Sequence, residues 1–342
     1  MSKRRQGIGS CVNIKNMTVV FFDIKDWEKE YLIKRLAGFE LTFFSESLTP
    51  ENVSKISKAD IISVFIYSKL NAILLSKLPN LKLISTRSTG FDHIDMEYCK
   101  NRGIEVSTVP QYGSDTVAEH SFALLLALTR RVVECVDKVR AGNFNPDGLT
   151  GTDLKGKILG VVGTGKIGMN VIKIANGFSM NVLAYDVNPD KEKQKDVNFK
   201  YVSLDELLKK SDIVTLHIPY CEDTHHLINR EKISLMKEGA FLINTSRGGI
   251  IETDALFDGV QSGKLAGVGL DVLEEEDFVK EEAEVLYRDT EGEANLKTVL
   301  ENHVLMNLPN VIITPHNAFN SKEALQRILD TTVENITQFK NV

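Results

Sequence analysis

Short apolar runs alternate with helix-length amphipathic stretches along most of the chain. Between Met17 and Thr108, five such runs are typical of strands: Val19–Phe22, Leu41–Phe44, Ile61–Phe65, Leu83–Thr86 and Ile104–Val106. Buried strands separated by helices indicate βαβ units, because a parallel crossover needs a dozen or more residues. The first third of the chain is therefore predicted to form an α/β unit with a parallel sheet.

A second alternating series follows a long predicted helix and a polar, Gly-rich connection. The helix is expected to begin near Thr116, with Glu119 completing a capping box, and to end before Gly142. Ser203 and Glu206 form another capping box. Six strand candidates follow the connection: Ile158–Val162, Val182–Tyr185, Ile213–Leu216, Phe241–Asn244, Val268–Val272 and Val311–Ile313. Six strands with intervening helices suit a doubly wound nucleotide-binding domain.

The composition is that of an ordinary globular protein. The chain has 342 residues, 42% of them hydrophobic, and a formal net charge of −6, which fits about two or three domains. This charge gives no electrostatic reason to expect a nucleic-acid partner. The longest strongly apolar stretch, Phe122–Leu128, is far short of the ~20 residues of a membrane-spanning helix. No membrane span is predicted.

The N-terminus and the cysteines both favour a cytoplasmic protein. Residues 1–16 lack the apolar core of a signal peptide. We expect a flexible tail there, and the sequence leaves open whether translation starts at Met1 or Met17. The four cysteines stand singly, without a CxxC pair or zinc-like spacing; they are Cys11, Cys99, Cys135 and Cys221. Reduced thiols and no metal site are expected.

A dinucleotide-binding fingerprint opens the second series. Gly163, Gly165 and Gly168 form GxGxxG directly after a predicted strand and at the start of a helix. The three glycines permit a tight turn, close approach to a pyrophosphate and close packing of helix on sheet. Asp186 ends the next strand, 18 residues after Gly168, where a carboxylate binds ribose hydroxyls and repels the extra phosphate of NADP. NAD is therefore the predicted cofactor.

Three polar side chains follow later predicted strands, where open α/β sheets place their ligands. Arg247 lies in the run NTSRGG, Glu276 follows Asp271, and His316 follows Thr314 and a proline. Beside a nicotinamide, they supply what reduction of a 2-keto acid requires. These are a cation for the carboxylate, a proton donor, and an acid that keeps the donor protonated.

The chain resembles the D-isomer-specific 2-hydroxyacid dehydrogenases, and within that family it is most similar to the D-lactate dehydrogenases. The resemblance extends from about Met17 to the end of the chain. The matching stretches are TRSTGFDHID from Thr86, VPQY from Val109, VAEH from Val117, GTGKIG from Gly163, LHIP from Leu216, NTSRGG from Asn244, GLDV from Gly269 and TPH from Thr314.

The resemblance implies roles for the catalytic residues. Arg247 would bind the substrate carboxylate and carbonyl, His316 would be the acid/base, and Glu276 would be its partner. Glu276 is preferred to Glu274 or Glu275 because the family's glutamate stands five places after the aspartate matched by Asp271. Formate dehydrogenases carry glutamine there, so the chain does not resemble them.

The resemblance also implies substrate and cofactor contacts. Substrate-binding residues would be Thr89 and Gly90 through their backbone amides, Tyr112 and Phe319 in the pocket, and Arg247. Besides the three glycines and Asp186, cofactor-binding residues would be Lys166 and Ile167 at the pyrophosphate, His217 and Pro219 at the adenosine, Thr245, Ser246, and Asp271 near the nicotinamide amide.

The architecture implied by the resemblance is two doubly wound parallel-sheet domains. A Rossmann NAD domain of residues 116–316 would be inserted into a flavodoxin-like substrate domain, made of residues 17–115 and 317–342. The long helix after Thr116 belongs to the region through which relatives dimerise, so a homodimer is expected.

The predicted function is NAD-dependent reduction of a small 2-keto acid, pyruvate to D-lactate. Other members of the family act on hydroxypyruvate, on branched or aromatic 2-keto acids, or on phosphite, and these alternatives remain open. An alternative function outside the enzymes is that of an NAD-sensing binding protein similar to the C-terminal-binding-protein corepressors. The chain lacks their long extra tail.

Overall fold

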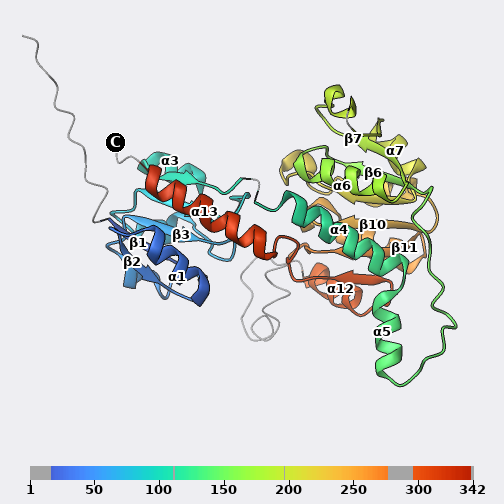
Figure 1. Ribbon diagram of the computed structural model, residues 1–342, viewed down its shortest axis with the longest axis horizontal. Coiled ribbons are helices and arrows are strands. Elements are labelled where there is room, and N and C mark those ends of the chain that lie inside the picture. The colour runs from blue at the N-terminus through green and yellow to red at the C-terminus, as the bar shows by residue number, and fades with distance from the viewer. Residues whose placement is uncertain (1–16, 111, 196, 276–295, 340–342) are drawn as a thin grey trace, which may run out of the picture. The chain divides into compact units, whose positions relative to one another are not determined.

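A computed structural model describes residues 17–110, 112–195, 197–275 and 296–339 (Figure 1). The predicted tail at 1–16 lies outside these ranges. Contacts within the chain divide it into two compact units. Unit 1 contains the residues up to Tyr112 and those from Ser321 onward, and unit 2 runs from Gly113 to Asn320.

Unit 1 is built on a five-stranded parallel sheet with the strand order β2-β1-β3-β4-β5. This is the order of flavodoxin-like folds. Its strands are β1 (Thr18–Phe21), β2 (Glu40–Phe43), β3 (Ile61–Val64), β4 (Leu83–Thr86) and β5 (Glu105–Ser107). Each lies within a residue or two of its predicted range. The central strands β3 and β4 are buried along their whole length, whereas the edge strands β2 and β5 are only partly buried.

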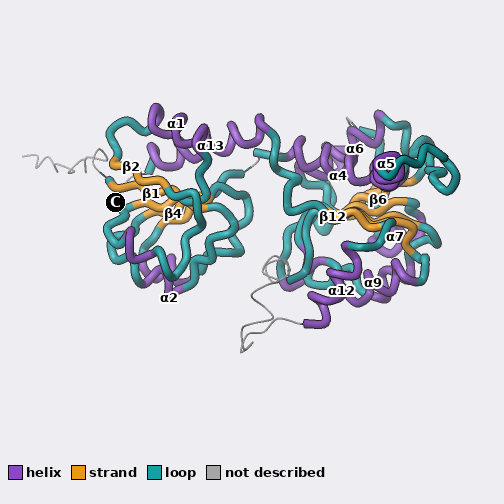
Figure 2. The backbone as a smooth tube through the Cα atoms, turned by 90° about the horizontal axis from the view of Figure 1, so that it is seen from below, coloured by secondary structure: helices purple, strands orange, loops and turns teal. Residues whose placement is uncertain are grey.

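Helices cover both faces of this sheet, as Figure 2 shows. They are α1 (Asp26–Arg35), α2 (Ala72–Ser76), α3 (Met96–Arg102) and α13 (Lys322–Gln338), with a 3₁₀ turn, η1, at Val53–Ile56. Successive strand side chains point to opposite faces. Val19 and Phe21 therefore pack with α1 and α13, whereas Val20 and Phe22 pack with α2 and α3.

Unit 2 contains a seven-stranded parallel sheet with the order β12-β11-β10-β9-β6-β7-β8. The six strands from β6 to β11 have the order of dinucleotide-binding folds, in which strands are added first on one side of β6 and then, from β9 onward, on the other side. The strands are β6 (Ile158–Val162), β7 (Asn181–Tyr185), β8 (Lys200–Tyr201), β9 (Ile213–Leu216), β10 (Ala240–Asn244), β11 (Leu265–Leu270) and β12 (Val311–Ile313).

Two apolar layers enclose this second sheet (Figure 2). One layer contains α4 (Ser114–Thr129) and α6 (Lys166–Gly177), and the other contains α7 (Leu204–Lys210), α8 (Arg230–Leu235), α9 (Thr253–Gln261) and α12 (Leu296–Met306). A further helix, α5 (Val132–Arg140), buries none of its residues. Short 3₁₀ turns are η2 (Lys191–Lys195), η3 (Glu222–Thr224) and η4 (Gly248–Ile250). The predicted fold class is confirmed by both sheets.

The prediction of a single long helix from Thr116 is wrong in two respects: the helix starts earlier, and the segment forms two helices, α4 and α5. The helix already begins at Ser114, and the Val117 amide donates to the Gly113 carbonyl, so Thr116 is not its cap. It ends at Thr129, whose carbonyl accepts a hydrogen bond from the Thr152 amide, 2.8 Å away. Arg131 then adopts a left-handed φ of 52°, and a new helix starts.

Smaller differences concern capping and strand ends. Ser203 caps α7 as expected, accepting from the Glu206 amide, but the Glu206 carboxylate binds Lys210 and does not complete the predicted capping box. The strand predicted to reach Val272 ends at Leu270, and β8 was not predicted. Within the described ranges, no helix combines the length and apolar character needed to cross a bilayer.

Candidate functional site

In the glycine loop after β6, two glycines are packed tightly against backbone and the third, Gly165, faces open space. A Cβ on Gly163 would lie 2.4 Å from the His217 carbonyl oxygen, and one on Gly168 would lie 2.0 Å from the Gly163 carbonyl oxygen. Around Gly165, by contrast, no atom other than those of Gly165 and its chain neighbours lies within 4 Å of the Cβ position. Lys166 and Ile167 begin the first turn of α6, with Gly165 as its N-cap. The free amides of a helix N-terminus favour an anion. The residues present therefore fit a dinucleotide pyrophosphate.

Asp186 follows β7 and lies beside the glycine loop. One carboxylate oxygen accepts hydrogen bonds from the Thr164 amide at 2.7 Å and the Thr164 hydroxyl at 2.8 Å, and the other accepts from the Asn188 amide at 2.9 Å. Burial alone would raise the pKa of Asp186, but these hydrogen bonds and nearby Lys193 outweigh it and lower the pKa. An ionised carboxylate is thus held directly beside the glycine loop.

His217 follows β9, and one of its two ring nitrogens lacks a hydrogen-bond partner among the described residues. Its Nε2 lies 2.9 Å from the Thr215 hydroxyl, whereas Nδ1 is buried without a hydrogen-bond partner among the described residues. Burial lowers the pKa of His217 to about 3, so the imidazole is neutral near pH 7. Pro219, two residues on, is exposed. An orphaned buried nitrogen fits a site that a ligand completes.

The NTSRGG loop after β10 is fixed by Asn244, which is fully buried. The Asn244 side chain accepts from the Ser246 amide and donates to the Arg247 carbonyl. The Ser246 hydroxyl donates to the Leu216 carbonyl, and the Thr245 hydroxyl lies 2.9 Å from that of Ser121 on α4. The half-buried Arg247 guanidinium donates to the Ser246 carbonyl at 2.8 Å. The backbone that carries the Arg247 guanidinium is therefore held in place by these hydrogen bonds.

Asp271, at the end of β11, organises the turn that carries His316. Its carboxylate accepts hydrogen bonds from the Asn317 and Ala318 amides, both at 2.8 Å, and from the Thr314 hydroxyl. The His316 amide donates to the Asp271 carbonyl at 2.9 Å, and His316 has a left-handed φ of 51°. Arg247, Asp271 and His316 thus follow the adjacent strands β10, β11 and β12, at the same edge as the glycine loop.

The third predicted catalytic residue, Glu276, lies outside the described residues. Its neighbour Glu274 is engaged elsewhere. The Glu274 carboxylate pairs with His226 Nε2 at 2.6 Å and accepts from the Thr253 hydroxyl at 2.7 Å. Glu274 therefore ties β11 to the start of α9, a role that the sequence analysis did not assign.

In unit 1, Thr89 and Gly90 follow β4. The Thr89 hydroxyl donates to the Val109 carbonyl and the Ser88 hydroxyl donates to the Gly90 carbonyl. Arg87, 3% exposed, donates to the carbonyls of Phe22, Asp23 and Ser63. Desolvation lowers the pKa of Arg87, against the raising effect of nearby carboxylates. The half-buried Tyr112 lies in this unit, whereas Phe319 lies in unit 2.

Sequence reasoning missed several side chains that shape these loops. His120 on α4 contacts Thr314, Arg87 anchors the loop after β4, and His226 pairs with Glu274. Each contact joins residues distant in sequence, so no local pattern signals it. The only sequence hint for His120 is its position in the matched run VAEH.

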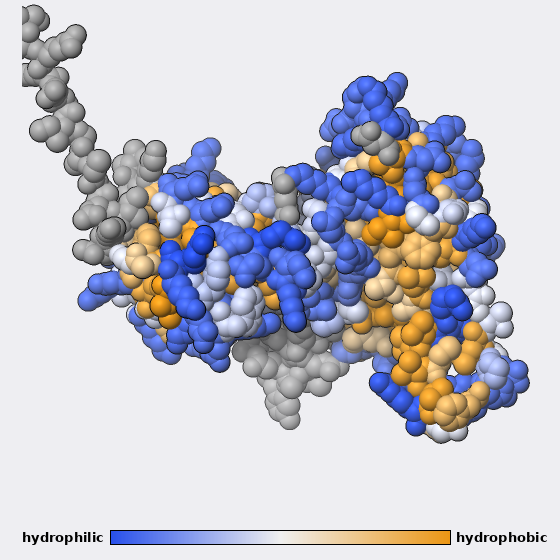
Figure 3. Space-filling model, viewed as in Figure 1, coloured by the Kyte–Doolittle hydropathy of each residue, from blue (hydrophilic) through white to orange (hydrophobic). Residues whose placement is uncertain are grey.

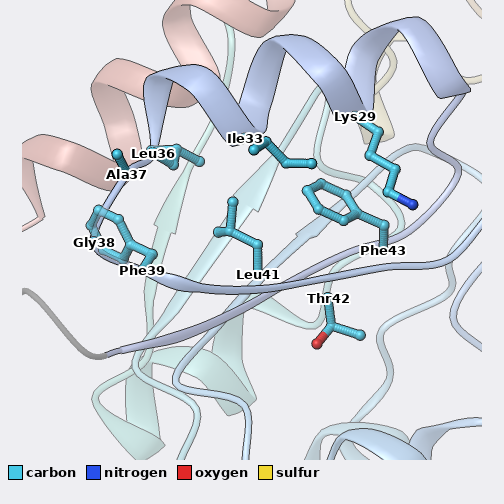
Figure 4. Close-up of a pocket in the computed structure, with 9 residues that line it drawn as sticks. All are labelled: Lys29, Ile33, Leu36, Ala37, Gly38, Phe39, Leu41, Thr42 and Phe43. Carbon is cyan, nitrogen blue, oxygen red and sulfur yellow. The ribbon is translucent and has the colours of Figure 1, made fainter.

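An open trough of about 600 Å³ lies elsewhere, between α1 and the edge strand β2. Figure 4 shows Lys29 and Ile33 above Leu41 and Phe43, with Thr42 pointing away. Its lining is mixed, with Lys29 and Thr42 beside apolar side chains, and it contains no histidine, cysteine or carboxylate. Among the described residues, no group of three or more His, Cys, Asp or Glu side chains could hold a metal ion.

Comparisons with known proteins agree with this geometry. A family model described as "D-isomer specific 2-hydroxyacid dehydrogenase, NAD binding domain" matches residues 122–318. The D-lactate dehydrogenase of Escherichia coli is 32% identical over 95% of this chain and 97% of its own. A D-specific alpha-keto acid dehydrogenase of Enterococcus faecalis is 39% identical over 87% of this chain and 88% of its own.

A solved structure is also similar over nearly the whole chain. The Aquifex aeolicus D-lactate dehydrogenase complexed with NAD and lactic acid has a TM-score of 0.83 and 41% identity, covering 93% of this chain and 94% of that one. The chain therefore belongs to the D-isomer-specific 2-hydroxyacid dehydrogenase family. It is an oxidoreductase that acts on a CH–OH group with NAD as cofactor.

Proposed function

We propose that this enzyme reduces pyruvate to D-lactate. The observation that carries the proposal is the placement of Arg247 and His316 after β10 and β12, on either side of the Asp271 strand and at the same sheet edge as the glycine loop. Similarity to a D-lactate dehydrogenase over 93% of the chain supports the choice of substrate.

In this mechanism, His316 in its protonated form donates a proton to the carbonyl oxygen of the keto acid. NADH, when bound, supplies the hydride that C2 accepts. Arg247 binds the carboxylate and polarises the carbonyl, because a guanidinium offers two parallel hydrogen bonds to a carboxylate. Glu276 is proposed to keep His316 protonated by favouring the imidazolium.

Unit 2 is proposed as the NAD domain and unit 1 as the substrate domain. The amides of Lys166 and Ile167 would hold the pyrophosphate, Asp186 the ribose, and His217 and Pro219 the adenosine. Thr245 and Ser246 would lie along the cofactor, and Asp271 near the nicotinamide amide. Thr89, Gly90, Tyr112 and Phe319 would bind and enclose the substrate. The open side of Gly165 and the rigid loop after β4 support these assignments.

A panel of keto acids tests the proposed function. Initial rates of NADH oxidation are measured with pyruvate, hydroxypyruvate, 2-ketoisocaproate and phenylpyruvate, and the product enantiomer is identified. The expected result is fastest turnover of pyruvate, yielding D-lactate.

The other outcomes of this panel separate the alternatives. A preference for a bulkier acid would keep the mechanism and change the substrate, an alternative that similarity to a D-specific alpha-keto acid dehydrogenase favours. L-lactate as product would contradict the proposal. Tight NADH binding without turnover of these acids or of phosphite would favour an NAD-sensing, corepressor-like protein.

A homodimer formed around α5 is part of the proposal. Four valines of this helix are 40–47% exposed; they are Val132, Val133, Val136 and Val139. Phe144, which follows this helix in the chain, is 79% exposed, and Figure 3 shows apolar surface in the region of α5. Removing such a patch from water favours association.

Val136→Asp is expected to convert the dimer to a monomer, because a carboxylate would be desolvated in the interface. Sedimentation velocity measures the change. Lys138→Gln, on the same helix, is the control and should remain dimeric. A monomeric wild-type protein would contradict the proposal.

We place the enzyme in the cytoplasm. The free thiols of Cys99, Cys135 and Cys221 support a reducing compartment. Cell fractionation with an antibody against the protein checks this assignment.

A further inference from the structure

His120 lies on α4 and contacts the His316 turn without belonging to it. Its Nε2 is 3.0 Å from the Thr314 hydroxyl and 3.5 Å from a carboxylate oxygen of Asp271. Its side chain is 19% exposed, whereas that of Asp271 is 1% exposed. The proposed reaction assigns no step to this imidazole.

The direction of the hydrogen bonds follows from the chemistry of the three groups. Burial would raise the pKa of Asp271, but hydrogen bonds from His120, Thr314, Ala318 and Asn317 lower it, so the carboxylate is ionised and can only accept. The Thr314 hydroxyl has one proton, which it donates to Asp271. Its oxygen can therefore only accept from His120, which must carry a proton on Nε2.

These hydrogen bonds connect His120, through Asp271, to the backbone of the turn that carries His316. The same Asp271 carboxylate receives the Asn317 and Ala318 amides, and the Asp271 carbonyl receives the His316 amide. His316 stands in the left-handed region at φ 51°, a conformation that costs a non-glycine residue free energy unless its surroundings hold it. Fixing the Asp271 carboxylate therefore fixes the direction of the imidazole.

We propose that His120 is a positioning residue, which orients the His316 turn through the Thr314 hydroxyl and the Asp271 carboxylate. The inference rests on the proposed function, because it assumes that His316 is the acid/base. Without the His120 donor, Thr314 can rotate away from Asp271, and the turn gains freedom. A displacement of about 1 Å in a reacting group can cost ~100-fold in rate.

The central test compares His120→Leu with His120→Gln. Leucine removes the donor, whereas the glutamine amide nitrogen is three bonds from Cβ, like Nε2, and can donate to Thr314. We expect His120→Leu to lower kcat by about 10- to 100-fold with unchanged KM for NADH, and His120→Gln to restore most of that loss. Glu119→Gln, at an exposed position of the same helix, is the matched control with wild-type kcat.

A double-mutant cycle tests the path. If His120 acts through the hydroxyl, His120→Leu adds little to the loss already caused by Thr314→Val, because the two changes break the same chain. Additive losses would overturn the path through Thr314. Thermal unfolding of each variant identifies any that fails to fold, in which case His120→Gln and Thr314→Val still report on the path.

A readout without substrate separates this inference from the proposed function. Hydrogen exchange of the Asn317 and Ala318 amides is expected to accelerate in His120→Leu and to stay at the wild-type rate in Glu119→Gln. Faster exchange in a protein that reduces no 2-keto acid would uphold the positioning contact and defeat the proposed function. Unchanged exchange together with unchanged kcat in an active enzyme would overturn the positioning role.

Discussion

Replacing His316 with glutamine is expected to lower kcat for keto acid reduction by about 100- to 10,000-fold, the range that a general acid contributes. Glutamine can donate a hydrogen bond to the carbonyl oxygen, but it cannot transfer a proton at neutral pH. The turn should survive, because Asp271 holds it through the Asn317 and Ala318 amides. Steady-state kinetics with pyruvate measures the loss.

NADH binding distinguishes loss of chemistry from loss of structure. His316→Gln should bind NADH as the wild type does, since the glycine loop and Asp186 belong to other turns of the same sheet edge. His303→Gln, on α12, is the matched histidine control with expected wild-type kcat. Turnover within a few-fold of wild type in His316→Gln would assign the proton transfer to another group.

The central strands could be predicted from sequence because burial on both faces makes them mostly apolar, as in β3, β6 and β9. The ranges predicted for Leu83–Thr86, Ile158–Val162 and Ile213–Leu216 coincide with β4, β6 and β9. β8 escaped prediction because a two-residue edge strand, Lys200–Tyr201, has no apolar run. The break after Thr129 escaped because it is marked only by the left-handed φ of Arg131 and by a hydrogen bond from the distant Thr152 amide, which no local pattern signals.

For the candidate site too, local sequence patterns predicted some contacts, whereas contacts between distant residues were not predicted. The glycine loop and Asp186 could be predicted because spacing along one βαβ unit determines their contact. His120 and Asp271 lie 151 residues apart in sequence, so their shared hydroxyl at Thr314 becomes visible only when α4 packs beside β11 and β12. The sequence analysis assigned Asp271 to the cofactor, whereas the structure engages its carboxylate in the His316 turn. Its contact with the nicotinamide stays a prediction.

Replacing Arg247 with glutamine is expected to lower kcat/KM for pyruvate by about 100-fold or more. Each hydrogen bond to a charged group is worth about 1.5–3 kcal/mol, or roughly 10- to 150-fold at 1.4 kcal/mol per factor of ten, and the guanidinium is proposed to make two. KM should rise because the carboxylate loses its cation, and kcat should fall because the carbonyl loses polarisation.

Arg247→Lys separates charge from geometry at this position. A lysine keeps the positive charge but not the planar fork, so it should recover part of KM and little of kcat. The Asn244 side chain binds only the backbone of the loop, and both variants should therefore keep the turn and bind NADH normally. If Arg247→Gln retained kcat/KM within a few-fold of wild type, the substrate carboxylate would have to be bound by another cation.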